Sequence, residues 1–332
     1  MEKIKKILNN IVKQYDLSCI DPSQKPYGII GAGNFAVVFD FGNAVMKLSN
    51  EGVYEEIKNN AQIINYLKEQ GVNTPETYLI EKVDIDTLSE NILDVLYKTV
   101  QDDEQDCKTI RKIVEGEIIF SKEKDTMFCI FQEKIDGINI FKQVGSLNEI
   151  LELYNQIPQK HYEKFILDAN NIIKQGIVID NINMSNFLYN KEKGFYFIDL
   201  GNLGKFILQD INNVKTPYDC TIENVLDVFP NLYNVRNQEV AKNSLDLFAK
   251  MYDTLKSVYI NNTNDEKFKE QTRREIISLQ SYLNGYLSAI HYIPENLKSK
   301  YTKKFNNIEK QLEDFKYEGQ FETEYYLMTL DK

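Results

Sequence analysis

Histidine and cysteine are scarce in this sequence, which has two histidines and four cysteines among 332 residues. The cysteines, at positions 19, 107, 129 and 220, lie far apart, and none belongs to a C-x-x-C pair. Zinc sites and disulfide-stapled folds need such residues at close spacing. We therefore expect neither. We expect a chain that works in a reducing compartment, either the cytoplasm or the cytosol of a host cell into which it is secreted.

Long apolar runs and an excess of positive charge are also absent. No segment approaches the roughly 20 apolar residues of a transmembrane helix, and the amphipathic start, MEKIKKILNNIVKQY, lacks the continuous apolar stretch of a secretory signal. Acidic residues outnumber basic ones by 50 to 39, which gives a net charge of -11. Because nucleic acids and anionic membranes bind clustered Lys and Arg, we expect neither as a partner.

Apolar residues are plentiful, at 42 % of the chain, so a substantial core can form. Their periodicity changes along the sequence. Short strand-like runs dominate as far as residue 134, and helical i, i+3, i+4 spacing dominates later. The pattern predicts an α+β fold with a β-rich first part and a mainly helical second part.

Within the first part, a Gly42-Asn43 turn joins two strand-like runs, and Gly71 ends a helix that runs to Gln70. An acidic stretch over residues 84–115 predicts a helical insertion. The strands are expected over residues 27–33, 35–41, 43–49, 77–83, 115–121 and 127–133.

The second part contains two short strand-like runs among helices. The helices are expected over residues 147–156 and 161–174 and, in almost unbroken succession, from 226 to the end, and the strands over 186–190 and 194–200. His161 is placed at the start of a helix, with no catalytic role. The Tyr- and Leu-rich stripes of the last helices are expected to be core, with a substrate pocket as the alternative.

The first segment with a chemical pattern is GAGNFAVV, residues 31–38, which lies between two strand-like runs. Its glycines, Gly31 and Gly33, would let backbone N–H groups approach phosphate oxygens, although a simple glycine turn has the same pattern. A strand follows instead of a helix, which argues against a dinucleotide-binding arrangement.

Lys47 is the second candidate, because it lies among apolar residues in the strand AVMKL. A lysine in such surroundings loses hydration unless it meets an anion. The alternative is an edge-strand lysine that points into water. Glu55 and Glu56, on the helix that follows, are candidate ion-pair partners.

The third candidate segment, residues 174–202, carries polar groups among apolar, strand-like neighbours. Carboxylate and amide oxygens at strand ends are ligands of the kind that Mg²⁺ prefers. Asp and Asn are also common in turns, but that explanation accounts less well for an apolar-flanked Asp-x-Gly thirteen residues after an apolar-flanked Asn. The polar residues are Asp180, Asn181, Asn186 and Asp199.

The order and spacing of these motifs over residues 27–205 resemble the protein kinase superfamily. The segment from Gly31 to Val38 is similar to the Gly-rich loop with Ala36 in place of its third glycine, and Ala44–Lys47 is similar to the β3 V-A-I-K motif. The remaining matches are Ile130–Glu133 for the strand entering the adenine-binding hinge, Gly176–Asn186 for the catalytic loop, and Asp199-Leu200-Gly201 for D-F-G.

The sequence departs from that pattern at the catalytic loop. The H-R-D triplet reads Ile179-Asp180-Asn181, so the histidine is missing and Asn181 takes the place of the catalytic aspartate, with Asp180 one residue early. No A-P-E follows, and Asn60 stands where the αC glutamate is expected, with Glu56 one turn earlier. These departures make divergent members, such as bacterial effector kinases or aminoglycoside- and choline-kinase-like enzymes, the better match.

The resemblance implies a two-lobed fold. Its N-lobe would cover residues 27–134 after an N-terminal helix over 1–26, its C-lobe core 135–225, and a helical extension 226–332. It also implies an ATP- and Mg²⁺- or Mn²⁺-dependent phosphotransferase that acts on Ser or Thr of a protein. A small hydroxyl-bearing substrate, AMP transfer from the same site and a nucleotide-binding pseudokinase remain alternatives.

In the implied site, Lys47, paired with Glu56, holds the α- and β-phosphates, and Asp180 or Asn181 serves the acceptor. The nucleotide would further contact Gly31, Gly33, Val38 and Glu133, and the metal would be held by Asn186 and Asp199.

Overall fold

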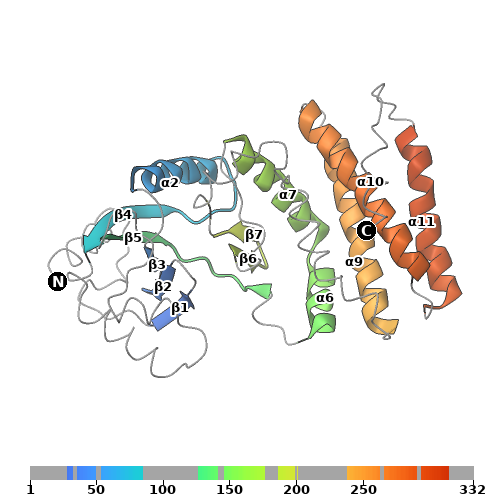
Figure 1. Cartoon of the computed structure of the whole chain (residues 1–332), viewed down its shortest axis with the longest axis horizontal. Helices are drawn as coiled ribbons and strands as arrows, with labels where there is room; N and C mark the ends of the chain where they lie inside the picture. Colours follow the sequence, from blue (N-terminus) through green and yellow to red (C-terminus); the bar gives the residue numbers. More distant parts are fainter. Residues whose placement is uncertain are drawn as a thin grey trace, which may run out of the picture.

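Figure 1 shows the computed structural model, which describes part of the chain. The expected N-terminal helix over residues 1–26, the expected strand 115–121 and nearly all of the insertion over 84–115 lie outside the described residues. The structure describes residues 28–32, 36–49, 54–84, 126–140, 146–175, 186–198, 200, 238–261, 265–289 and 293–313.

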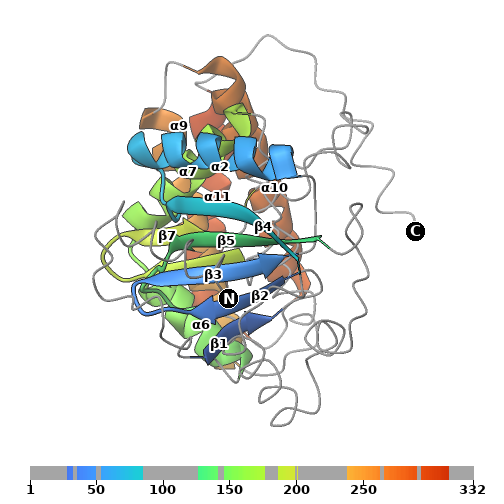
Figure 2. The ribbon, with the colours of Figure 1, turned by 90° about the vertical axis from the view of Figure 1, so that its left-hand side faces the viewer.

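A five-stranded antiparallel sheet forms the first part of the chain (Figure 2). The strands follow the order β1-β2-β3-β5-β4, so β3 is central. Gly42 lies in the turn between the second and third strands with φ 85°, and its N–H donates to Asp40 Oδ1 at 2.9 Å. The predicted hairpin is therefore confirmed. The strands are β1 (Gly28–Ala32), β2 (Ala36–Asp40), β3 (Ala44–Ser49), β4 (Thr77–Asp84) and β5 (Thr126–Glu133).

Helix α2 (Tyr54–Glu69) connects β3 to β4 and ends where the sequence predicts. The Val72 N–H donates to Leu67 O at 3.0 Å, and the Gly71 N–H donates to Lys68 O at 2.9 Å. These two bonds form a Schellman motif with Gly71, at φ 87°, in the left-handed position. The chain then turns back into β4, which leaves α2 packed against the sheet.

The second part consists of a short hairpin and five helices among the described residues (Figure 1). Figure 1 shows the sheet at one end of the molecule, the three longest helices at the other, and the hairpin and α7 between them. The elements are α6 (Leu147–Gln156), α7 (Gln159–Lys174), β6 (Phe187–Asn190), β7 (Gly194–Phe197), α9 (Gln238–Asn261), α10 (Glu266–Ala289) and α11 (Glu295–Glu313).

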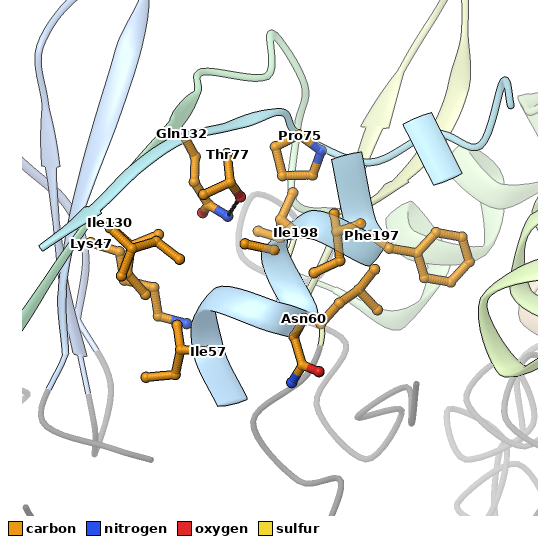
Figure 3. Close-up of a pocket in the computed structure, with 13 residues that line it drawn as sticks. Lys47, Ile57, Asn60, Pro75, Thr77, Ile130, Gln132, Phe197 and Ile198 are labelled. Atoms are coloured by element: carbon orange, nitrogen blue, oxygen red, sulfur yellow. Dashed lines mark hydrogen bonds between the residues drawn. The ribbon is translucent and has the colours of Figure 1, made fainter. Parts of the chain in front are cut away.

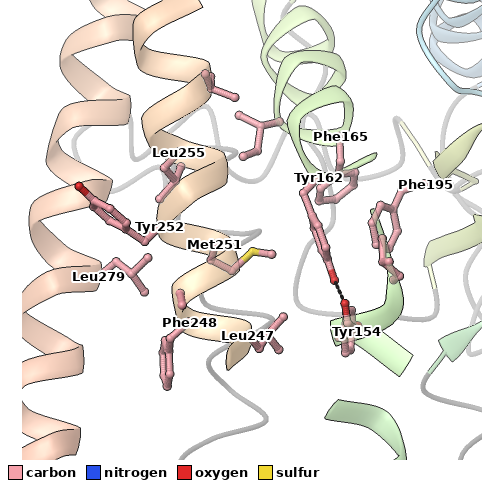
Figure 4. Close-up of a cluster of buried hydrophobic side chains, with 14 of the residues drawn as sticks. Tyr154, Tyr162, Phe165, Phe195, Leu247, Phe248, Met251, Tyr252, Leu255 and Leu279 are labelled. Atoms are coloured by element: carbon pink, nitrogen blue, oxygen red, sulfur yellow. Dashed lines mark hydrogen bonds between the residues drawn. The ribbon is translucent and has the colours of Figure 1, made fainter. Parts of the chain in front are cut away.

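One continuous apolar core runs from α2 through the hairpin to α11. Next to the hairpin it is aromatic: the Phe165 ring of α7 stacks on Phe197 at 4.8 Å between centroids and meets Phe187 edge-on at 5.3 Å. Figure 4 shows the helical side, where Tyr162 donates its hydroxyl hydrogen to Tyr154 O at 2.8 Å. The last helices, α9, α10 and α11, also contribute buried residues to this core, as their apolar stripes predict.

At this level the α+β prediction is confirmed: a small antiparallel sheet and a hairpin accompany mainly helical structure. Among the described residues, no helix is both long and apolar enough to cross a membrane. His161 lies in the first turn of α7, as predicted, and it is buried.

Candidate functional site

Lys47 occupies the central strand of the sheet, opposite Val38 of β2 and Ile130 of β5. Side chains alternate along β3: Ala44, Met46 and Leu48 are buried, and Val45 and Lys47 are half-buried on the other face. Figure 3 shows the Lys47 side chain extending from β3 toward α2, where its amine ends beside Ile57. The local strand pattern thus carries one cationic group into the space between the sheet and the helix.

A pocket of about 480 Å³, including space open to solvent, lies at this end of Lys47. Among the described residues that line it, Lys47 is the only one with a charge. The other lining residues are Ile57, Asn60, Ala61, Ile64, Pro75, Thr77, Ile80, Ile130, Gln132, Phe197, Ile198 and Leu200.

The far wall of the pocket comes from the segment that contains Asp199. Both chain neighbours of Asp199, Ile198 and Leu200, line the pocket together with Lys47. Lys47 and Ile198 lie 151 positions apart in the sequence and meet only because the sheet and the hairpin are brought together. Asp199 itself lies outside the described residues.

The β6–β7 hairpin holds Asn186 next to this wall. Its register pairs Phe187 with Phe197, and one step beyond the pair the Ile198 N–H donates to Asn186 O at 3.0 Å. Asn186 is buried, with 8 % of its surface exposed. An antiparallel hairpin therefore brings Asn186 beside Ile198, the residue that precedes Asp199, although twelve positions separate Asn186 and Ile198 in sequence.

A buried polar network fixes the α2–β4 connection against α7 and the hairpin. The Asn73 side chain donates to Lys193 O at 2.7 Å and to Phe195 O at 3.1 Å, and its backbone N–H donates to Asp168 Oδ2 at 3.0 Å. Burial raises the pKa of the Asp168 carboxyl, while its bonds to Lys164 and Asn73 act in the opposite direction. This network ties the α2–β4 connection to α7 and to the hairpin that leads to Ile198.

Glu133, the residue expected at the adenine-binding hinge, is the last residue of β5. Its side chain contacts the end of α2 and the residue before β4 instead of the pocket. Its carboxylate pairs with Lys68 of α2 and accepts the Glu76 N–H at 3.2 Å, and its own N–H donates to Glu76 O at 2.8 Å. Its neighbour Gln132 lines the pocket, while Glu133 is not among the lining residues that the structure describes.

The other expected site residues are divided between described and undescribed parts of the chain. Gly31 pairs with Val38 across β1 and β2, and neither is among the described lining residues of the pocket. Glu56 lies in α2, in a position whose side chain the structure does not describe. Three further residues of the expected site, Gly33, Asp180 and Asn181, lie outside the described residues.

Sequence reasoning did not assign Thr77 and Gln132 to the site. Gln132 Nε2 donates to Thr77 Oγ1 at 3.0 Å (Figure 3), which forms a polar patch on the sheet side of the pocket. Asn65 of α2 bonds both the N–H and the carbonyl of Thr77, at 2.8 and 2.7 Å. No local motif marks these residues, although their strands were predicted, because strand pairing alone brings them together.

Chemically, the pocket combines one ammonium group, amide and hydroxyl groups, and apolar walls. Such a set suits a ligand with an anionic part and an apolar part. Within the described part of the chain, no three His, Cys, Asp or Glu side chains gather as a metal site, and the expected aspartates, Asp180 and Asp199, lie outside it. No family model matches the sequence, and no curated protein is found to be similar to it.

Proposed function

We propose that this chain is an ATP- and Mg²⁺-dependent phosphotransferase with a two-lobed, protein-kinase-like fold, which transfers the γ-phosphate to a Ser or Thr hydroxyl of a protein. One observation carries the proposal: Lys47 lines the same pocket as both neighbours of Asp199. Two of the motifs on which the resemblance rests, far apart in sequence, thus meet at one pocket.

The arrangement of elements around the pocket supports the two-lobed interpretation. The strand with the lysine is central, the helix after it covers the pocket, and β5 leads from the sheet toward the helical part. The β6–β7 hairpin falls between the segment that resembles the catalytic loop and Asp199. Each element follows the order in which the kinase motifs occur.

The residues present suit a magnesium phosphate complex. Asn186 would contribute an amide oxygen and Asp199 a carboxylate, and Mg²⁺ usually takes one or two such ligands and completes its shell with water and phosphate oxygens. The ion would neutralise the charge of the β- and γ-phosphates. Lys47 would hold the α- and β-phosphates from the sheet side.

In the proposed reaction, the acceptor hydroxyl oxygen forms a bond to the γ-phosphorus. The bond from that phosphorus to the β–γ bridging oxygen breaks, and its electron pair leaves with ADP. Asp180 accepts the hydroxyl proton. Because this reaction depends mainly on positioning and charge neutralisation, a carboxylate one place away from the usual base position is compatible with turnover.

A nucleotide-binding protein without transfer activity is the second candidate. Asn181 favours it, because an amide at the usual base position cannot accept a proton as a carboxylate does. Such a protein would still use Lys47, Asn186 and Asp199 to bind Mg-ATP. The two candidates therefore differ in turnover and not in binding.

Labelled ATP separates these functions. The chain is incubated with Mg²⁺, generic protein and small-molecule acceptors, and ATP labelled at either the γ- or the α-phosphate. Protein-bound γ-label supports the proposal, γ-label on a small molecule points to a small-molecule kinase, and α-label points to AMP transfer. An Mg-ATP-dependent rise in melting temperature without any transfer supports the second candidate.

Lysine variants test the pocket itself. Lys47→Met should lower γ-label transfer by about 100-fold or more, because one positioned cation is lost from the phosphate site. Lys191→Met is the matched control, since Lys191 lies exposed in the hairpin turn. Equal transfer by wild type and Lys47→Met would contradict the assignment of the phosphate site to this pocket.

A further inference from the structure

Helix α2 contributes one polar residue to the lining of the pocket. Its four lining residues are Ile57, Asn60, Ala61 and Ile64, and three of them are apolar. At about 100° per residue these positions span an arc of about 100° on the helix. Position 56 falls about 40° beyond the edge of that arc, next to Asn60. Among the residues that the structure describes, Asn60 is therefore the polar residue that α2 contributes to the pocket.

Asn60 and Lys47 come from opposite walls of the pocket. Lys47 extends from the central strand, and Asn60 lies one turn beyond Ile57, next to which the lysine amine ends (Figure 3). The remaining described polar lining residues, Thr77 and Gln132, bond to each other on the sheet side. An anion bound between strand and helix would thus lie near one ammonium group and one amide.

We propose that Asn60 is a direct ligand of the anionic phosphate group that Lys47 neutralises; this inference rests on the proposed function. An asparagine amide offers two N–H donors, whereas a glutamate offers only acceptors when ionised. At this position the amide donates to a phosphate oxygen, and a carboxylate would repel it. In this arrangement a cation and a neutral donor bind the same anion.

The charge of the ligand should determine how much Asn60 matters. Hydrogen bonds to charged groups contribute more than bonds between neutral groups. Loss of the amide should therefore weaken binding of a nucleoside triphosphate and leave binding of the uncharged nucleoside nearly unchanged. A purely structural role for Asn60 would weaken both ligands alike.

The test compares Asn60→Asp with Asn59→Asp, which places the same charge on an exposed neighbouring position of α2. Dissociation constants for Mg-ATP and for adenosine are measured by calorimetric titration of the full chain. Asn60→Asp should raise the Mg-ATP constant about 10-fold or more, because a charge-assisted bond is lost and repulsion is added. The adenosine constant should change by less than about twofold, and Asn59→Asp should match wild type for both ligands.

Asn60→Ala removes the donor without adding charge, so it keeps the inference falsifiable if the aspartate variant does not fold. It should raise the Mg-ATP constant about 3- to 10-fold and leave adenosine unchanged. If wild type binds Mg-ATP and the Asn60 variants bind it equally well, the inference is overturned while the proposed function stands. If wild type binds no Mg-ATP, both are overturned.

Discussion

Asn73 joins the α2–β4 connection to the hairpin that leads to Asp199, so its replacement by alanine should destabilise the fold measurably. Asn73 is buried, and its side chain makes two hydrogen bonds, to Lys193 O at 2.7 Å and Phe195 O at 3.1 Å. Alanine leaves both carbonyl groups without that donor. The Phe195 bond is buried and the Lys193 bond is partly buried.

The size of the effect follows from the burial of these two acceptors. A buried acceptor left without its partner costs about 1–3 kcal/mol, and a partly hydrated one costs less. We therefore expect Asn73→Ala to lower the free energy of unfolding by about 2–4 kcal/mol. Urea denaturation, analysed by linear extrapolation, measures this difference between variant and wild type.

Asn59→Ala serves as the matched control, because Asn59 is exposed on α2. Its effect should stay within about 0.5 kcal/mol, as for most surface substitutions. A loss below about 0.5 kcal/mol for Asn73→Ala would refute the reasoning, since it would mean that the two carbonyls find other donors at no cost. Asn73→Asp should be at least as destabilising, because a carboxylate would face the same two carbonyl oxygens.

Three further substitutions test other parts of the fold. Phe197→Ala should lower the free energy of unfolding by about 3–5 kcal/mol in urea denaturation, because Phe197 is 1 % exposed and stacks on Phe165. Gly71→Ala should cost about 1–2 kcal/mol by the same measurement: no atom within 4 Å of an added Cβ would clash, so the cost is that of a positive φ. Burial and Lys160 lower the pKa of His161, so below about pH 6.5 the unfolded chain binds an extra proton and stability should fall. His161→Gln should reduce that loss in a pH series of melting curves.

Most regular elements could be predicted because their determinants are local. The turn at Gly42 and the helix end at Gly71 each need a positive φ, and glycine adopts it without steric cost. The strands β6 and β7 were expected from two short apolar runs, and the turn at residues 191–193 sets the register in which they pair. Propensity and pattern were therefore sufficient to predict these elements.

The candidate site could be predicted only in part. Lys47 was selected because a lysine among apolar strand residues needs a polar or anionic environment, and the structure places it at a pocket. Asn60 was noted only as a residue in an expected glutamate position. Nothing in the local sequence indicated that Gln132 and Thr77 would hydrogen-bond across β5 and β4.

The sequence by itself determined the approximate positions of the described strands and helices, because capping, turn chemistry and apolar periodicity act over a few residues. The tertiary structure alone decided that Lys47, Asn60 and the neighbours of Asp199 line one pocket. That convergence depends on strand order and on the packing of α2 and the hairpin, which are contacts between residues far apart in sequence. No short segment carries information about such contacts, since each becomes favourable only when the whole core has formed.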